Sequence, residues 1–321
     1  LNLCEVWKAV DSFQFEDRAK FRDELLWQEF SRHLYAIMGQ NNKKMWNYSV
    51  ENINKPVNTS EMNCIQTIKN ELVETGYMVN QTRMWFSSHH SFRAEENWNK
   101  YEDFMFKHLV DGSRFANRLG WQWVMGGQTG KLYGFAQSQV KNRAPKLCQQ
   151  CNLQYKCPIQ TWPDESKYEP IDQEIDYDIK SKFGPTETIN SHEKPSVVWL
   201  TGESMGDDDP ALKAHPELPV IFIFDNVLLN KIQISTKRII FLLETLKELA
   251  LKRKVLVFIG DPKLILNDYN YAVTFACVPK YKEITMINKP VAEYPTVRLA
   301  DPISFYPRSY TSWKKKITLT V

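Results

Sequence analysis

The 321-residue sequence lacks several features that would assign it at once to a class of protein. It has no apolar run of about 18 residues, so we expect no membrane-spanning helix. Its second half has no glycine-rich motif for cradling phosphates, which argues against an NTPase or a dinucleotide-dependent dehydrogenase. The net charge is only +3. Any contact with nucleic acid must therefore come from a local basic patch.

A secretory signal is also lacking. The sequence starts Leu1-Asn2-Leu3, with no Met and no apolar signal segment. Six cysteines without such a signal argue against a disulfide scaffold. We therefore expect an intracellular protein, either in the cytoplasm or in an organelle after cleavage of a targeting segment.

Four of the six cysteines form the most informative pattern. Cys148, Cys151 and Cys157-Pro158 are close in sequence, and Cys64 lies far upstream. Four thiolates can close a tetrahedral site for Zn²⁺ or an iron–sulfur cluster, and Pro after the last Cys is typical of cluster motifs. The alternative is that they are ordinary buried thiols, a common environment for free Cys. Spacing alone does not single out Cys64, because Cys4 and Cys277 are also available.

The two halves of the chain have different patterns. Apolar residues recur at three- and four-residue steps over 17–38 and 63–75, which predicts amphipathic helices, the second ending at Gly76. Further helices are predicted over 81–90 and 97–109. Eight of the ten Trp precede residue 165. Residues 1–160 are therefore predicted to form a helical domain.

Residues 161–195 are rich in Pro and acidic residues and are predicted to be a linker. Beyond it, apolar strands are predicted over 197–200, 220–225, 255–261 and 272–278, with an amphipathic helix over 236–252. Continuous apolar strands alternating with helices indicate a parallel sheet covered on both faces. The predicted fold class is α plus α/β: a helical domain followed by a Rossmann-like, doubly wound domain over 196–321.

Two aspartates, Asp225 and Asp261, follow predicted strands and fall at the carboxyl edge of that sheet. They either belong to a small-ligand site or cap the helices that follow.

The sharpest signal lies between residues 75 and 127. It consists of Asn80-Gln-Thr-Arg83-Met84, then Trp98, then Asp111-Gly-Ser, then Asn117-Arg-Leu-Gly-Trp121-Gln-Trp123. This order of motifs resembles the flavin-binding core of the DNA photolyase/cryptochrome family. Upstream, Glu24-Leu-Leu-Trp27-Gln-Glu-Phe30 resembles the family's Glu-Leu-x-Trp-Arg-Glu-Phe helix.

The resemblance implies an FAD site. Asn117 matches the polar partner of flavin N5, Arg83 and Asp111 match a buried ion pair beside the isoalloxazine, and Asn80 belongs to the same cofactor-binding motif. Trp121 and Trp98 match the two inner members of an electron-transfer chain that re-reduces the photoexcited flavin. The outer Trp of that chain is not assigned, although Trp85 and Trp123 are available.

The resemblance also implies a DNA substrate. Glu24 and Trp27 lie on one helix face and, with Met84, match the residues that contact a flipped pyrimidine dimer in the family's repair enzymes. The alternative is that all three residues are helix packing. The implied partner is DNA with a pyrimidine lesion, including single-stranded DNA.

The four cysteines resemble those of the iron–sulfur bacterial branch of this family, in which they bind a [4Fe–4S] cluster. This resemblance selects Cys64, Cys148, Cys151 and Cys157 as the ligands. Zn²⁺ remains the competing metal.

The sequence departs from the family pattern at several positions. Gln28 and Gln81 stand where the family has Arg, and Ser113 stands where it has Asp. Leu1 to Trp7 resembles the segment that follows the family's Ser/Thr-rich diphosphate loop. We therefore expect either that this loop is missing from the chain or that the flavin phosphates are held differently.

The second half is similar to the family's antenna domain. Val197 to Leu212, which includes Asp209-Pro210, resembles the first strand and turn of that domain, which precedes the flavin core in the family but follows it here. The expected function is light-driven electron transfer from reduced FAD to a pyrimidine dimer. The alternatives are a blue-light sensor or redox flavoprotein that does not repair DNA and binds a protein partner, and an interaction protein that has lost FAD.

Overall fold

The computed structural model describes residues 2–53, 55–56, 60–93, 97–160, 165–172 and 178–321. The chain forms two compact units, of which the first comprises Leu1–Gln40, Asp176–Gln233 and Ile239–Val321 and the second comprises Asn41–Ile175 and Ile234–Arg238. No helix within the described ranges is long and apolar enough to cross a membrane.

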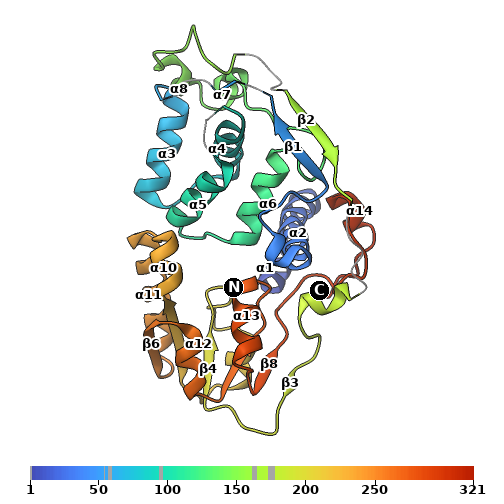
Figure 1. Ribbon diagram of the computed structural model, residues 1–321, viewed down its shortest axis with the longest axis vertical. Helices are drawn as coiled ribbons and strands as arrows, with labels where there is room; N and C mark the ends of the chain where they lie inside the picture. Colours follow the sequence, from blue (N-terminus) through green and yellow to red (C-terminus); the bar gives the residue numbers. More distant parts are fainter. Residues whose placement is uncertain (1, 54, 57–59, 94–96, 161–164, 173–177) are drawn as a thin grey trace. The chain divides into compact units, whose positions relative to one another are not determined.

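The second unit is mainly helical (Figure 1). Its helices are α3 (Asn63–Thr75), α4 (Asn80–Phe92), α5 (Trp98–His108), α6 (Arg114–Val124), α7 (Gln137–Arg143) and α8 (Pro145–Gln149). The predicted helices match α3, α4 and α5 to within two residues, because their apolar stripes form one core with buried residues such as Ile68, Leu72, Phe86 and Met105. Gly76 ends α3 in the left-handed conformation, as predicted.

A two-stranded antiparallel sheet completes this unit, with β1 (Tyr48–Asn52) paired to β2 (Ser166–Pro170). The strand β2 lies inside the segment predicted to be a linker. That prediction rested on Pro and acidic residues and missed the cross-strand pairing, which is a long-range contact. The rest of the acidic run, residues 173–177, lies outside the described residues.

The first unit contains a six-stranded sheet in the order β3-β8-β7-β4-β5-β6. The strands are β3 (Ile189–Asn190), β4 (Val197–Leu200), β5 (Val220–Asp225), β6 (Val255–Gly260), β7 (Tyr271–Thr274) and β8 (Ala292–Tyr294). Five strands run parallel, and β3 pairs antiparallel to β8. The sheet is therefore mixed, compatible with the predicted α plus α/β class but not purely parallel.

Helices cover both faces of this sheet, as the apolar strands predict. Val198, Val220 and Phe222 pack on one face with residues of α9 (Pro210–Ala214) and α11 (Thr236–Ala250). Trp199, Ile221 and Val273 pack on the other face with residues that include Ile284 of α13 (Pro279–Ile287). The remaining helices of the unit are α1 (Leu3–Ala9), α2 (Phe15–Met38), α10 (Asn226–Ile232), α12 (Pro262–Ile265) and α14 (Tyr310–Lys314), with 3₁₀ turns at Val10–Ser12, Ile179–Phe183 and Leu266–Asp268 and another, Gly39–Asn41, at the boundary between the units.

The compact units divide the chain differently from the predicted domains 1–160, 161–195 and 196–321. Helix α2 belongs to the unit of the sheet, because its aromatic side chains pack on α14. Phe30 contacts Tyr310 and Trp313, with ring centroids 5.7 and 5.5 Å apart, and the indole of Trp313 donates a hydrogen bond to His33 Nδ1 (3.0 Å). These contacts join residues about 280 positions apart, and sequence periodicity cannot predict contacts over such a separation. The predicted division stays a prediction about the chain's modules.

Candidate functional site

Three polar residues of the helical unit meet at one place, from α4, the turn after α5, and α6. Arg83 donates from Nη2 to both carboxylate oxygens of Asp111 (3.2 and 3.0 Å) and from Nη1 to Asn117 Oδ1 (3.3 Å). Its Nε donates to the carbonyl of Met78 (2.9 Å), which fixes the guanidinium plane. The structure therefore brings together three of the four predicted cofactor-binding residues.

These three residues differ in burial. Asp111 is 60% exposed and Arg83 21% exposed, so the ion pair is formed but is not the buried pair that the family resemblance implies. Asp111 is accessible because it lies in the turn between α5 and α6 rather than on a helix face. Asn117, by contrast, is 6% exposed, and its Nδ2 has no hydrogen-bond partner among the described residues. An unpartnered buried amide N–H costs about 1–3 kcal/mol, so this position suits an acceptor atom of a bound group.

The flanking residues of α4 lie nearer the surface. Asn80, the fourth predicted cofactor residue, begins α4 and is exposed. Gln81, which replaces an Arg of the family, donates to the hydroxyl of Tyr133 (2.7 Å). Met84 is half-buried on the same helix. The Gln81 amide is therefore engaged inside its own unit.

Trp98 and Trp121, the predicted relay residues, are in contact. Their ring centroids lie 6.4 Å apart with an angle of 29° between the planes. Trp121 is 1% exposed, and its indole Nε1–H has no acceptor among the described residues, whereas Trp98 is half-buried. Trp85 and Trp123 instead contact Phe135 and Tyr133. The pair thus runs from a buried indole to one nearer the surface.

A buried charge network that the sequence analysis missed links α5 and α6, the two helices that carry Trp98 and Trp121. Glu102 of α5 is fully buried and accepts hydrogen bonds from Arg114 (2.5 Å) and from Arg118 Nε and Nη2 (3.2 and 2.9 Å), both on α6. Breaking such a pair from one side typically costs about 3–5 kcal/mol. A sequence signal existed, because Glu102 stands four residues after Trp98 and three before Met105, on the apolar face of the helix.

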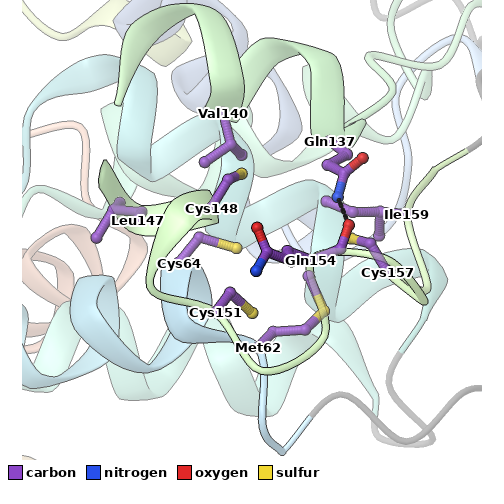
Figure 2. Close-up of a pocket in the computed structure, with 10 residues that line it drawn as sticks. All are labelled: Met62, Cys64, Gln137, Val140, Leu147, Cys148, Cys151, Gln154, Cys157 and Ile159. Carbon is purple, nitrogen blue, oxygen red and sulfur yellow. Dashed lines mark hydrogen bonds between the residues drawn. The ribbon is translucent and has the colours of Figure 1, made fainter. Parts of the chain in front are cut away.

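The four predicted metal-ligating cysteines line one pocket of the helical unit (Figure 2). Cys64 is contributed by α3, Cys148 by α8, and Cys151 and Cys157 by the loop that follows. The other lining residues are Met62, Gln137, Val140, Leu147, Gln154 and Ile159. The contacts between α3 and α8, including a hydrogen bond from Asn63 Nδ2 to the carbonyl of Leu147 (3.1 Å), place the isolated cysteine beside the other three.

Three of the four thiols of this pocket, those of Cys64, Cys148 and Cys157, have a raised pKa. Burial, together with charge repulsion from the nearby Cys157, Cys148 and Cys151, raises the pKa of Cys64 to about 12. Burial also raises the pKa values of Cys148 and Cys157. A bound cation would reverse this direction, because thiolates are its ligands. Nevertheless, no three or more His, Cys, Asp or Glu side chains of the described residues are arranged to hold a metal ion.

The predicted lesion-binding residues are divided between the two units. Glu24 and Trp27 lie on α2 in the first unit, whereas Met84 is in the second. Glu24 is exposed. The Trp27 ring is stacked on Tyr310 of α14, with centroids 3.8 Å apart and 12° between the planes. One face of the indole is therefore already covered by the protein.

The aspartates that follow the strands are helix caps. Asp225 Oδ1 accepts from the backbone N–H of Leu228 (2.9 Å), and Asp261 Oδ1 accepts from that of Lys263 (2.9 Å). Asp209, before Pro210, does the same for Leu212 (3.0 Å). Of the two sequence interpretations, capping is confirmed.

Comparison with known proteins relates the chain to a single class of enzymes. It is 30% identical over 120 residues to a deoxyribodipyrimidine photo-lyase of Buchnera aphidicola subsp. Baizongia pistaciae, which is 34% of this chain and 25% of that enzyme. It is 28% identical over 141 residues to the photo-lyase of Synechococcus sp., covering 38% of this chain and 29% of that enzyme. A third such enzyme, from Vibrio cholerae serotype O1, is 30% identical over 111 residues, 31% of this chain and 24% of the enzyme.

The matches are partial. No protein-family model and no solved structure matches the chain. The aligned part spans about a quarter of the length of these curated relatives. All five matching proteins carry the same enzyme name. Over about a third of its length, this chain is therefore similar to deoxyribodipyrimidine photo-lyases.

Proposed function

We propose that the helical unit binds FAD and that the protein acts as a light-driven electron-transfer flavoprotein of the photolyase type. The observation that carries this proposal is the convergence of Arg83, Asp111 and Asn117, with Asn117 Nδ2 buried and unpartnered. When bound, FAD would supply light absorption and the electron for cleavage of a pyrimidine dimer in DNA.

The residues present fit such a group. Asn117 Nδ2 is available to donate to an acceptor nitrogen of the isoalloxazine ring, and Arg83, held by Asp111 and Met78, keeps Asn117 Oδ1 engaged so that the amide presents its N–H₂ end. Trp121 and Trp98 form the contact through which an electron passes inward from the surface. Asn80 contributes at the start of α4.

We further propose that the cysteine pocket holds a [4Fe–4S] cluster, with Zn²⁺ as the competing occupant. Four thiols in one largely apolar pocket form the donor set that both require. Cys64, Cys148, Cys151 and Cys157 would be the ligands. The cluster site would tie α3 to α8, which favours a structural role.

DNA with a pyrimidine lesion is the substrate that the relatives' name suggests. In this proposal Glu24, Trp27 and Met84 contact the flipped lesion. One observation favours the second candidate, a blue-light sensor or redox flavoprotein without repair activity: Tyr310 already stacks on Trp27. A lesion would have to use the opposite face of the indole. The third candidate, an interaction protein without FAD, makes no use of the unpartnered Asn117.

Residues 196–321, which contribute most of the sheet of the first unit, are proposed to be the antenna-type module of the family, placed after the flavin core. Its support is the order β6-β5-β4-β7-β8, in which β4 is central, β5 and β6 extend the sheet on one side, and β7 and β8 extend it on the other. A central strand extended on both sides in this way supports a doubly wound, Rossmann-like module, to which β3 adds an antiparallel edge strand.

The proposed electron transfer is tested by illuminating the full chain anaerobically with FAD and an external electron donor, and following the loss of oxidised-flavin absorbance. We expect photoreduction in the wild type, a drop of at least about tenfold in Trp121→Phe (about 1.4 kcal/mol), and a normal rate in Trp85→Phe. Trp85 is the matched control, because it is equally buried but contacts Phe135 instead of Trp98. Equal rates in all three proteins would refute the relay.

Binding of an oligonucleotide with and without a pyrimidine dimer separates the two leading candidates. A preference for the lesion that is lost on Glu24→Gln supports repair. Equal, weak binding of both oligonucleotides by a photoreducible protein supports the sensor or redox candidate.

A further inference from the structure

The sheet of the first unit ends in an open edge. Strand β6 is last in the strand order and, among the described strands, pairs only with β5 (Figure 1). Two of its side chains are notably accessible for a strand of this apolar composition: Val257 is 45% exposed and Ile259 is 75% exposed. An apolar edge strand is a template for pairing with another strand.

The register shows which backbone groups face outward. The N–H of Val220 in β5 donates to the carbonyl of Lys254 (2.8 Å), so Lys254 directs its backbone groups toward β5. Successive residues of a strand direct these groups to opposite sides. Val255, Val257 and Ile259 therefore direct their N–H and C=O groups away from β5, to the open edge.

Natural edges are usually protected by a proline, a bulge or a charge within the strand. Strand β6 has the sequence Val-Leu-Val-Phe-Ile-Gly, with none of these residues, and it pairs with β5 residue for residue over its whole length. Charges lie only beyond its ends. The basic run Lys252-Arg253-Lys254 precedes the strand, and Asp261 follows it.

This arrangement of charge and register is self-complementary. When two copies of the strand run antiparallel about a two-fold axis normal to the sheet, a residue lies opposite its own copy. With Val257 opposite the partner's Val257, Val255 faces the partner's Ile259. Beyond the strand ends, the position of Arg253, whose guanidinium also donates to the carbonyls of Leu212 and His215 in its own chain, faces the partner's Asp261. A parallel arrangement would instead place the two basic runs together.

We propose that two copies of this chain associate through β6, in antiparallel register about Val257, to form one continuous twelve-stranded sheet, twice the six strands of one copy. In this register Val255, Val257 and Ile259 each donate and accept one hydrogen bond with the partner chain. Exposed apolar side chains of both copies are covered at the same time. The proposal is independent of flavin or DNA binding.

The molar mass of the full chain, measured by sedimentation over a roughly hundredfold range of concentration, tests this directly. The wild type is expected to shift from monomer to dimer. Ile259→Lys is expected to stay monomeric. The exposed position tolerates Lys within one copy, but in the dimer each of the two lysines would be placed against the apolar Val255 of the other copy. Met286→Lys is the matched control: it replaces an equally exposed (75%) apolar residue on α13 and should dimerise like the wild type. A monomeric wild type, or a dimeric Ile259→Lys, would overturn the proposal.

Amide hydrogen exchange locates the contact residue by residue. The amides of Val257 and Ile259 should exchange fast in monomeric Ile259→Lys and at least about tenfold more slowly in the wild-type dimer. The amides of Leu256 and Phe258, which face β5, should be protected in both proteins. Slow exchange of position 257 only when a different protein is added would assign the edge to that partner and reject the homodimer.

A separate variant tests the proposed charge pairing between Asp261 and the partner's Arg253. Asp261→Asn keeps the helix cap, since Asn is as good a cap as Asp, but removes the charge opposite Arg253. We expect a several-fold weaker dimer whose remaining affinity depends less on salt. An unchanged affinity and salt dependence would contradict the proposed register.

Discussion

Two regions of this protein hold the aromatic and polar residues that its sequence marks as functional, and they differ in how well those residues are satisfied. Around α4 and α6, Asn117 Nδ2 and Trp121 Nε1 are buried without acceptors. At the α2–α14 seam, defined by Trp27, Phe30, His33, Tyr310 and Trp313, the ring nitrogen of Trp313 bonds His33 and the hydroxyl of Tyr310 bonds Asp23. The first region therefore has buried hydrogen-bond donors that could bind a ligand, whereas in the second region the corresponding groups are bonded within the protein.

The difference teaches that residue type alone does not mark a site. A Trp on a motif position serves equally well as a relay member or as a packing residue. The unpartnered buried amide of Asn117 indicates a site, because folded proteins rarely leave such a donor without a reason. For the tryptophans the contact with Trp98 is what separates Trp121 from Trp85, whose indole N–H is also unpartnered among the described residues. Four predictions follow this comparison, in order of decreasing effect.

The seam should be the more fragile region. Trp313 is fully buried and hydrogen-bonded to His33. Trp313→Ala should therefore lower the free energy of unfolding by about 3–5 kcal/mol. Urea denaturation followed by circular dichroism measures this loss. A loss below about 1 kcal/mol would show that the seam is not a packing unit.

Acid should destabilise the helical unit through buried histidines. Burial lowers the pKa of His89 to about 3 and of His90 to about 2. Since the unfolded-state pKa is near 6.5, the unfolded chain binds more protons below pH 6.5, and stability falls as the pH falls toward those folded-state values. His90 stacks on Tyr101 with centroids 3.6 Å apart, and neither ring nitrogen has a hydrogen-bond partner among the described residues.

His90→Phe keeps the stacking but cannot be protonated. At pH 5, compared with pH 7, it should be stabilised relative to the wild type by about 2 kcal/mol. Denaturation at both pH values tests this, with the exposed His192→Phe as a control that should show no such difference. Parallel pH curves for wild type and His90→Phe would exclude His90 as the acid-sensitive group.

At the proposed flavin site, in contrast to the seam, we expect a substitution to change ligand affinity more than stability. Asn117→Leu removes an unpartnered N–H together with the acceptor of one Arg83 bond. We expect a stability change within about 1 kcal/mol but FAD binding weaker by at least about tenfold. Fluorescence titration with FAD measures the affinity. An unchanged affinity would show that Asn117 does not contact the flavin.

The smallest effect is expected at Glu24, which is exposed on α2. Glu24→Gln should change the free energy of unfolding by no more than about 0.5 kcal/mol. Any loss of lesion-specific DNA binding in this variant would then report on contact with the lesion. A larger loss of stability would show instead that Glu24 is part of the seam.

Local patterns predicted the helices and the central strands well. The apolar stripes gave α3 with its Gly76 cap, and the strands β4 and β5, residue for residue. Each depends on neighbours within a few positions, which periodicity and capping rules describe. The amphipathic face of α11 was predicted less well: Leu243 is 43% exposed, although it has the spacing of a core residue.

Long-range contacts were not predictable from those patterns. The β1–β2 pairing, the antiparallel β3 and the stacking of Tyr310 on Trp27 join residues more than 100 positions apart. The Arg83–Asp111–Asn117 contact and the Trp98–Trp121 pair were reached through family resemblance, which carries long-range information that spacing lacks. That resemblance still overstated the burial of Asp111.

The most direct measurement is an absorption spectrum of the full chain purified without oxygen, with flavin, iron, sulfide and zinc quantified on the same sample. The account predicts a structured flavin band near one flavin per chain, reached directly or after adding FAD, and roughly four irons per chain that disappear in Cys64→Ser but not in Cys277→Ser. Cys277 is the control because it is buried outside the cysteine pocket. A folded, colourless protein that takes up no FAD would contradict the central claim that the helical unit is a flavin site.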